Sequence, residues 1–408
     1  MKHELRQTVL FCLAAAALAA AAVVVDPGGR TPDILSDQGE LFYPNFTDPQ
    51  APKSIEVIDY NEETATATPL KVEFRDNKWL LPSHRDYPAD AQDRLASTAA
   101  ALIELKKDIV VTENAEDHAE YGVIDPFDEA AASLVGRGKR VTLRDAEGEV
   151  LADFIIGKEV PDKTGFRYMR VPGQRRVYAV ETSADVSARF QDWIETDLLK
   201  IDTSSLRRIA VNSYSIDERL GRIEQGDQLT LTKTGDDWKL GARTPKDEAI
   251  AKLTSALDDL RIVDAEHKPD GLMASLKAQE GIELTMESFQ SLRSKGYFIN
   301  QYTGQLLSNE GEIIVDTADG LQYTLRFGEI ADAPSASASE QAGEPEGGER
   351  RYVFVTVSFA QSRADEYGGD AAKGKELEEE LRNRFADWYY VISGADFSSL
   401  RPSSADLL

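Results

Sequence analysis

Hydrophobic and polar residues alternate in short stretches over most of the first half of this chain, and few stretches show helical spacing. Alternation with a period of two predicts strands at 55–58, 70–74, 141–143, 150–156, 166–171 and 177–180. Leu95, Leu102 and Leu105 share one face of a predicted helix over 89–106. A short helix is expected to run into Phe190 and Trp193. The pattern therefore indicates strands and hairpins around one main helix.

The second half of the chain repeats this order of predicted elements. Strands are predicted at 206–211, 229–232, 313–315, 323–327 and 352–359. A helix is predicted from about 245 to 260, where Ile250, Leu253 and Leu257 recur at helical spacing. We expect a polar loop over 362–376, leading to a final helix. Antiparallel or mixed strands with one main helix and a short closing helix in each half predict an α+β fold.

Three pairs of sequence markers recur in the same order in the two halves. These structural repeat markers are Trp79 and Trp238, Gly157 and Gly328, and Trp193 and Trp388. Their separations grow from 159 to 171 and then to 195 residues, and the last pair ends the motif Arg-Phe-x-Asp-Trp in both halves. Separations that only grow are typical of a duplicated domain whose second copy has gained insertions. We therefore predict two tandem homologous domains in which the members of each pair superpose.

The domain boundaries follow from changes in composition. Residues 54–203 are predicted to form the first repeat domain and residues 204–401 the second, with a tail at 402–408. An insertion at about 331–349 contains no aromatic or branched aliphatic residue, so we predict that it is disordered. Segment 27–53 holds five prolines and is predicted to be a linker that lifts the first domain away from a membrane.

The first 26 residues are predicted to be a membrane anchor or signal segment. Val9 to Val25 is an uninterrupted apolar run of 17 residues, preceded by Lys2 and Arg6. This length suits a short transmembrane helix, and a cleaved signal peptide or a buried helix are the alternatives. The basic flank orients the rest of the chain outside the cytoplasm. The expected location is the cytoplasmic membrane, with a single pass and the bulk of the chain in the periplasm.

Charge and cysteine content narrow the range of functions. The 408 residues carry a formal net charge of −26, which argues against binding nucleic acid and against docking on anionic lipid. Solubility is the simplest reading of this acidity, and binding of basic or metal-rich partners is the alternative. Cys12, inside the apolar run, is the only cysteine, so the exported part has neither a disulfide nor a thiol nucleophile.

Four motifs of the first half are similar to those of a bacterial family, domain of unknown function 4340. They are Trp79-Leu80-Leu81-Pro82, Tyr121-Gly122-Val123-Ile124-Asp125-Pro126, Ile156-Gly157, and Trp193 followed by Leu198-Leu199. Val123 stands where the family usually has leucine. The resemblance covers about 54–210 and, more loosely, 205–401, where Gly281 to Leu284 is the predicted remnant of the Tyr-Gly step. It implies an extracytoplasmic accessory subunit, often encoded beside ABC-type transporter components of the gliding-motility and export kind. The family has no known catalytic residues.

Candidate chemistry is sparse in the sequence. His84, His118 and His267 are isolated from one another, and His3 precedes the apolar run, so we interpret them as surface or capping residues and predict no metal site. Acidic pairs such as Asp258-Asp259 lack the ladder of a calcium loop. Trp193 and Trp388 are interpreted as core anchors, with ligand binding as the alternative. We predict no catalytic, metal-binding or cofactor-binding residue and no cofactor.

Three hypotheses on function follow. The leading one is a non-enzymatic, membrane-tethered scaffold that acts through contacts with membrane proteins, such as an ABC-type permease and its ATPase. The second is an envelope receptor that binds a polysaccharide, a peptide or a small solute in a cleft between the domains, and a cleft lined by both domains would favour it. The third is a hydrolase with an unrecognised site.

Overall fold

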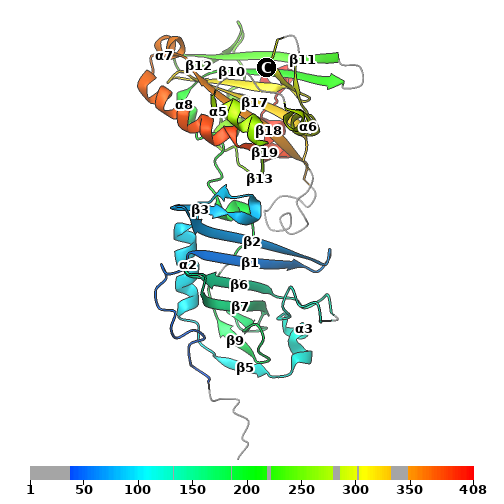
Figure 1. Ribbon diagram of the computed structural model, residues 1–408. Helices are drawn as coiled ribbons and strands as arrows, with labels where there is room; N and C mark the ends of the chain where they lie inside the picture. Colours follow the sequence, from blue (N-terminus) through cyan, green and yellow to red (C-terminus); the bar gives the residue numbers. More distant parts are fainter. Residues whose placement is uncertain are drawn as a thin grey trace, which may run out of the picture.

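The computed structural model describes residues 37–131, 133–184, 186–217, 222–278, 285–300, 303–331 and 348–408. The predicted membrane segment, the remnant at 281–284 and most of the insertion at 331–349 lie outside these residues. Within the described ranges, no helix is both long and apolar enough to cross a bilayer. The described chain forms two lobes, the first over residues 37–203 and the second over residues 204–408 (Figure 1).

The first lobe is built on a nine-stranded sheet with the order β4-β3-β2-β1-β6-β7-β8-β9-β5. Its strands are β1 (Ser54–Asn61), β2 (Thr66–Arg75), β3 (Lys78–Leu81), β4 (Tyr87–Pro88), β5 (Ile109–Thr112), β6 (Lys139–Arg144), β7 (Val150–Glu159), β8 (Phe166–Arg170) and β9 (Val177–Glu181). Its helices are α2 (Gln92–Ile103) and α3 (His118–Tyr121), with 3-10 turns η2 (Pro82–His84), η3 (Ala115–Asp117), η4 (Phe190–Trp193) and η5 (Thr203–Ser205).

The second lobe holds an eight-stranded sheet with the order β12-β11-β10-β16-β17-β18-β19-β13 and a small sheet of β14 and β15. Its strands are β10 (Leu206–Asp217), β11 (Arg222–Thr234), β12 (Asp237–Leu240), β13 (Asp264–His267), β14 (Tyr297–Ile299), β15 (Leu306–Ser308), β16 (Glu312–Thr317), β17 (Leu321–Ile330), β18 (Arg350–Phe359) and β19 (Trp388–Ser393). Its helices are α4 (Asp247–Asp258), α5 (Asp270–Ala278), α6 (Met286–Ser294), α7 (Gln361–Tyr367), α8 (Ala371–Ala386), α9 (Gly394–Ser399) and α10 (Ser404–Leu407).

The two large sheets have the same strand order. The edge strand β4 of the first sheet has no counterpart in the second. Every other strand has one, from β3 and β12 at one end of the shared order to β5 and β13 at the other. In both lobes the main helix, α2 or α4, lies in the chain between these two edge strands. The named strand pairs in both large sheets are antiparallel, both those joined by short hairpins and those far apart in the chain, such as β1 with β6 and β10 with β16. The α+β class predicted from the alternation pattern is confirmed.

Alternation along the strands explains how each sheet contributes to the core. In β18, Val353, Val355 and Val357 face one apolar cluster, whereas Tyr352 and Phe354 face another. Successive side chains of a strand point to opposite sides, and β18 carries buried apolar side chains on both sides. The large sheet must therefore be covered on both of its faces at this strand. In the second lobe, α4 and α8 contribute to the first cluster, and α5, α6 and the small sheet contribute to the second.

The segment at 362–376, predicted to be a polar loop, is mostly helical. It contains most of α7 and the first turns of α8. Asp370 caps α8, because its carboxylate accepts hydrogen bonds from the backbone N–H groups of Ala372 and Lys373. The loop prediction was wrong because this stretch has few apolar residues. Helix-forming Ala, Glu and Lys residues and an N-cap can nevertheless specify a helix that packs through Leu381 and Phe385.

The described part of the predicted Pro-rich linker, residues 37–53, packs on the first lobe instead of acting as a free spacer. Phe42 and Phe46 are buried in the core. The Asp37 carboxylate binds Lys107 at 3.1 Å, Arg176 at 2.7 Å and the Tyr178 hydroxyl at 2.6 Å. The prediction of a free spacer was wrong for residues 37–53. Prolines exclude regular strands and helices, but they do not prevent neighbouring aromatic residues from being buried.

Candidate functional site

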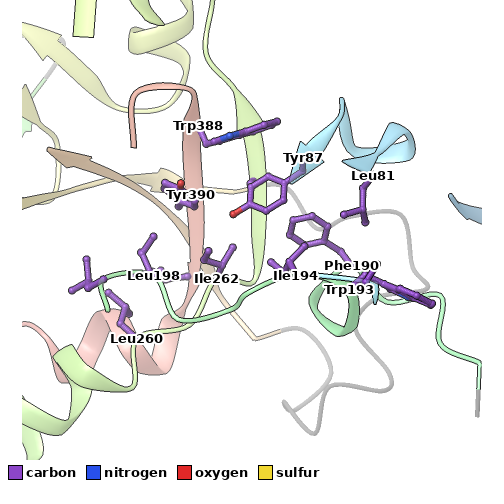
Figure 2. Close-up of a cluster of buried hydrophobic side chains, with 14 of the residues drawn as sticks. Leu81, Tyr87, Phe190, Trp193, Ile194, Leu198, Leu260, Ile262, Trp388 and Tyr390 are labelled. Carbon is purple, nitrogen blue, oxygen red and sulfur yellow. The ribbon is translucent and has the colours of Figure 1, made fainter. Parts of the chain in front are cut away.

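The two lobes meet in a continuous apolar junction. Figure 2 shows side chains of both lobes in one cluster, among them Tyr87, Phe190 and Trp388. Some of them belong to residues 186–203, the part of the first lobe that leads from β9 to β10, which we term the connecting segment. The Tyr87 ring lies 4.7 Å from that of Trp388 and 5.1 Å from that of Phe190, measured between centroids. The connecting segment also pairs with the second lobe, because the N–H of Leu198 donates to the carbonyl of Leu260 at 2.9 Å. The burial of several large side chains fixes one lobe against the other.

An open cleft of about 1070 Å³ lies beside this junction and is lined by both lobes. The first lobe contributes the turn between η2 and β4, and the second contributes the end of β13, the start of α5, one side of α6 and the start of β19. The lining residues are Arg85, Asp86, Pro88, Glu266, His267, Lys268, Pro269, Asp270, Glu287, Gln290, Ser291, Ser294, Lys295, Asp387 and Trp388. Most of these side chains are charged or polar, so the cleft suits a polar ligand or a polar protein surface.

A carboxylate from the second lobe is held inside the cleft by groups on several elements. Glu266 binds the Lys295 ammonium at 2.7 Å and accepts a hydrogen bond from the Tyr352 hydroxyl. Burial raises the pKa of Glu266, but the bonds from Lys295 and Tyr352, together with the Arg85 charge from the first lobe, bring that pKa below its usual value. Glu266 is therefore ionised at neutral pH, and its charge interacts with Lys295 of its own lobe and with Arg85 of the first lobe.

Lys268 forms the buried wall of the cleft and is almost inaccessible to solvent. Its ammonium donates to the carbonyl oxygens of Phe385 at 2.7 Å and Trp388 at 2.6 Å, and it lies 4.1 Å from the Phe354 ring centroid. Burial lowers the pKa of Lys268 well below its ordinary value, although the nearby charge of Asp387 opposes this shift. Because the C-terminal carbonyls of a helix favour a cation, Lys268 stabilises the end of α8 and its turn into β19.

Further carboxylates lie on the second-lobe side of the cleft. Asp387 binds the Lys277 ammonium at 2.5 Å. Asp270 and Glu287 stand in the first turns of α5 and α6, where the helix dipole favours negative charge. Among the described residues, no group of three or more His, Cys, Asp or Glu is arranged to hold a metal ion. The carboxylates and ammonium groups named above give the cleft its ionic and hydrogen-bonding side chains.

Two of the three marker pairs occupy equivalent places in the strand order. Trp79 and Trp238 lie in the counterpart strands β3 and β12. Gly157 and Gly328 lie in β7 and β17, and the pairing register of each strand shifts next to the glycine. A Cβ on either glycine would clash with a backbone carbonyl, of Tyr121 or of Lys295 respectively. These glycines permit a close approach of two backbones at the same position in both lobes.

The third pair, Trp193 and Trp388, does not occupy equivalent places. Trp388 opens β19, the counterpart of β9, whereas Trp193 follows β9 in the turn η4. The prediction that these two residues superpose is therefore wrong. Both are buried, and the Trp193 indole N–H donates to the carbonyl of Ser187 at 3.0 Å. Each belongs to the junction cluster, so the repeated Arg-Phe-x-Asp-Trp motif supplies aromatic side chains to one shared core.

The structure corrects the interpretation of His118 as a surface or capping residue, and it places His84 in a half-buried position. The His118 ring is buried, and its Nε2 is 2.8 Å from the carbonyl of Arg175. The His84 ring stacks on that of Phe190 at 4.6 Å, and burial lowers the pKa of His84. His267 lines the cleft and packs edge-on against Trp388 at 4.8 Å. The three histidines are held by separate contacts in the described structure.

Sequence reasoning missed the residues that form the cleft. Two helices and residues outside the described ranges separate Lys295 from Glu266 and Lys268, and each of the three looks like a surface charge in the sequence. The available signal was His267-Lys268-Pro269, where a proline two residues after a short strand stands directly before a helix. Their proximity depends on tertiary contacts that local patterns do not encode.

Comparison with known proteins adds one match. No curated protein and no solved structure matches this chain. Residues 79–280 match the model of a family described as "Domain of unknown function (DUF4340)". The match begins at β3 of the first lobe and ends just after α5 of the second, so it includes the connecting segment and part of the cleft. On these residues, the chain belongs to the DUF4340 family.

Proposed function

We propose that this protein is a membrane-tethered, extracytoplasmic accessory protein that acts by contact with other proteins and not by catalysis. The observation that carries the proposal is the apolar junction, in which the Tyr87 and Trp388 rings lie 4.7 Å apart and join the two lobes into one body. A body of this kind presents surfaces of both lobes at a fixed separation, which favours simultaneous binding to neighbouring subunits of an assembly. The apolar run at 9–25 supplies the tether in this proposal.

The partners that we propose are an ABC-type permease and its ATPase. One membrane segment is too little to form a transport path, so transport would belong to the other chains. The test is purification of the full chain from membranes in mild detergent, with quantitative mass spectrometry of what accompanies it. We expect permease and ATPase subunits in fixed ratio. A full chain that elutes alone after gentle cross-linking would contradict the proposal.

The location is tested separately by a reporter fused after Arg30. Lys2 and Arg6 are expected to hold the amino end in the cytoplasm, so a periplasm-dependent reporter should be active at this junction. Activity of a cytoplasm-dependent reporter would refute this orientation. N-terminal sequencing of the mature chain separates an uncleaved anchor from a signal peptide removed near residue 23.

We also infer that the two lobes arose by duplication of one domain. The common strand order supports this inference, as do the equivalent positions of Trp79 and Trp238 and of Gly157 and Gly328. In this reading the second copy gained α5 and the small sheet, which help to cover one face of its large sheet.

The cleft favours a second candidate function, that of an envelope receptor for a polar ligand. The supporting observation is that residues from both lobes line a hollow of about 1070 Å³. The test is thermal unfolding of the full chain with defined peptidoglycan fragments, oligosaccharides and short peptides. A ligand that raises the unfolding temperature of the native chain but not of a Glu287→Lys variant would support a receptor, because that substitution changes the cleft and leaves the core intact.

A further inference from the structure

The loop between α3 and β6 of the first lobe exposes large apolar side chains. Phe127 is 52% exposed, Leu134 55% and Val135 56%. These three residues form what we term the apolar knob. Large apolar residues exposed singly are ordinary, but three within nine residues of one loop are characteristic of an interaction surface.

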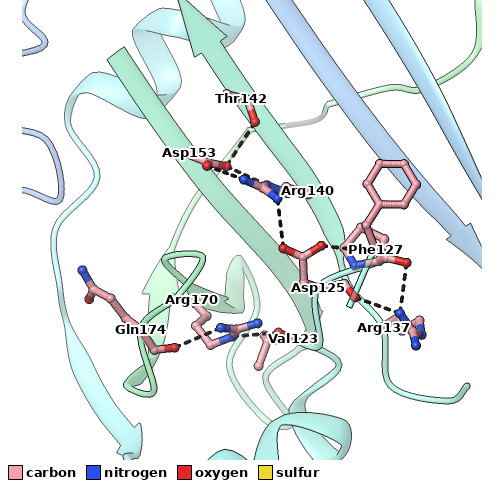
Figure 3. A network of polar contacts seen from close by, with 10 residues as sticks. Val123, Asp125, Phe127, Arg137, Arg140, Thr142, Asp153, Arg170 and Gln174 are labelled. Carbon is pink, nitrogen blue, oxygen red and sulfur yellow. Dashed lines mark hydrogen bonds and ion pairs between the residues drawn. The ribbon is translucent and has the colours of Figure 1, made fainter. Parts of the chain in front are cut away.

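Polar contacts of a half-buried arginine hold the backbone of this loop in place. The Arg137 guanidinium donates to the carbonyl oxygens of Asp125 and Pro126 at 3.0 Å each, and to that of Asp128 at 2.9 Å. The same guanidinium lies 5.2 Å from the Tyr60 ring centroid. One side chain therefore fixes the carbonyl groups on both sides of Phe127. Figure 3 shows Arg137 beside Asp125 and Phe127.

A second set of contacts fixes the beginning and the end of the loop. The Asp125 carboxylate binds Arg140 at 3.0 Å, and Arg140 in turn binds Asp153 on β7 at 2.7 Å (Figure 3). At the other end, the N–H of Gly136 donates to the Glu62 carboxylate at 2.7 Å. A loop that is ordered before binding loses less conformational entropy when a partner binds its side chains.

In the second lobe, the segment that corresponds to this loop packs into the lobe's own core. Gly122 and Gly296 both have positive φ angles after a helix, at the same step of the two lobes. In the second lobe, Gly296 leads into the β14–β15 hairpin, whose Tyr297 and Leu306 are buried. The apolar residues of the corresponding loop in the first lobe point to solvent, so the first lobe's own fold does not account for them.

We infer that the apolar knob is a docking site for a protein partner that has an apolar pocket with a basic rim. Asp128 and Glu129 directly follow Phe127 and are exposed, so the knob pairs apolar surface with negative charge. This combination is complementary to a pocket bordered by Lys or Arg, and it disfavours an anionic lipid surface. The inference rests on the proposed function and names the part of the first lobe that makes the contact.

The first experiment is site-specific photo-cross-linking with the full chain in native membranes. Benzoylphenylalanine replaces Phe127, and a matched control carries it at Val150, which is 47% exposed at a hairpin end of the same lobe. We expect one discrete protein adduct from position 127 and none from position 150. An adduct only with lipid, an adduct only with a second copy of this chain, equal adducts from both positions, or no adduct would each overturn the inference.

The second experiment measures the affinity of the full chain for the partner identified by mass spectrometry, after that partner has been purified. Phe127→Ala should weaken binding by about 30-fold, as expected for a buried aromatic anchor. Glu129→Lys should weaken it several-fold at low salt and have no effect at high salt. Arg137→Lys keeps the charge but cannot make the same set of bonds, so it should weaken binding by about 5-fold through the loop alone. Unchanged affinity of Phe127→Ala would also overturn the inference.

The outcome separates this inference from the proposed function. If Phe127→Ala and Leu134→Ser variants still co-purify with membrane partners at wild-type levels, the knob is not the contact and the proposed function stands. If the unmodified chain has no partner in the same preparation, the proposed function itself fails.

Discussion

Replacing Lys268 with methionine tests whether the hydrogen bonds of this buried lysine hold the wall of the cleft. Methionine preserves the packing against Phe354 but removes the two charge-assisted hydrogen bonds to the carbonyls of Phe385 and Trp388. Such bonds contribute about 1.5–3 kcal/mol each, and part of that gain is offset because the ammonium no longer has to be desolvated. The expected loss in the free energy of unfolding is about 3 kcal/mol at neutral pH.

The pH dependence of that loss is the sharper test. Burial lowers the folded-state pKa of Lys268 below its unfolded value, so the unfolded chain binds more protons between these two pKa values. The stability contributed by this group therefore rises with pH in that window, by up to about 1.4 kcal/mol per pH unit, and is lower below it. Contributions from other groups cancel in the comparison with Lys268→Met. We expect the gap in stability between the two proteins to widen as the pH rises from neutral toward about 10.

The assay is urea unfolding followed by far-ultraviolet circular dichroism at pH 6.5, 8 and 9.5. Lys277→Met serves as the matched control, because Lys277 forms a more exposed ion pair with Asp387 and should change stability by no more than about 1 kcal/mol. A loss below about 0.5 kcal/mol for Lys268→Met, or a gap that narrows as the pH rises, would refute this account of a buried lysine that holds the wall by hydrogen bonds and whose charged form is disfavoured by burial.

Three further changes test the packing of the lobes. Gly328→Ala should lower the free energy of unfolding by about 3 kcal/mol, measured by urea unfolding, because its Cβ would clash with a backbone carbonyl. A double-mutant cycle of Tyr87→Ala and Trp388→Ala should give a coupling of about 1 kcal/mol, since their rings are in contact across the junction; additive losses would contradict that contact. Deleting residues 332–347 should shift the melting temperature by less than about 2 °C, whereas a deletion that also removes the buried Ala331 should lower it further.

The alternation pattern predicted most strands, because a side-chain period of two directly reflects burial on one or both faces of a sheet. Strands such as 352–359 were predicted close to their observed bounds, since Tyr352 to Val355 are apolar on both faces. The helices α5 and α6 were not predicted, since each buries only a few apolar side chains, such as Leu272 and Leu292.

Motif matching without topology misplaced Trp388. The repeated motif around Trp193 and Trp388 has one sequence but two structural contexts, a turn after a strand and the start of a strand. Both structural contexts require buried aromatic side chains, so the similarity of the two sequence motifs could not distinguish one context from the other. The cleft depends on Arg85 and Glu266 approaching each other from different lobes, which no local pattern specifies.

The attachment of Asp37 has a mechanical consequence. If the chain is pulled from its amino end, the first contacts of the described residues to bear the load are those of Asp37 with Lys107, Arg176 and Tyr178. Their rupture, followed by withdrawal of Phe42 and Phe46 from the core, would peel residues 37–53 from the lobe without breaking the strand ladders, which begin at β1 (Ser54–Asn61). Extended chain spans about 3.4 Å per residue, so this release would add roughly 55 Å of reach. Without load, residues 37–53 stay packed on the first lobe. Under tension the chain before β1 would lengthen by this fixed amount, while the sheet of the first lobe stays folded.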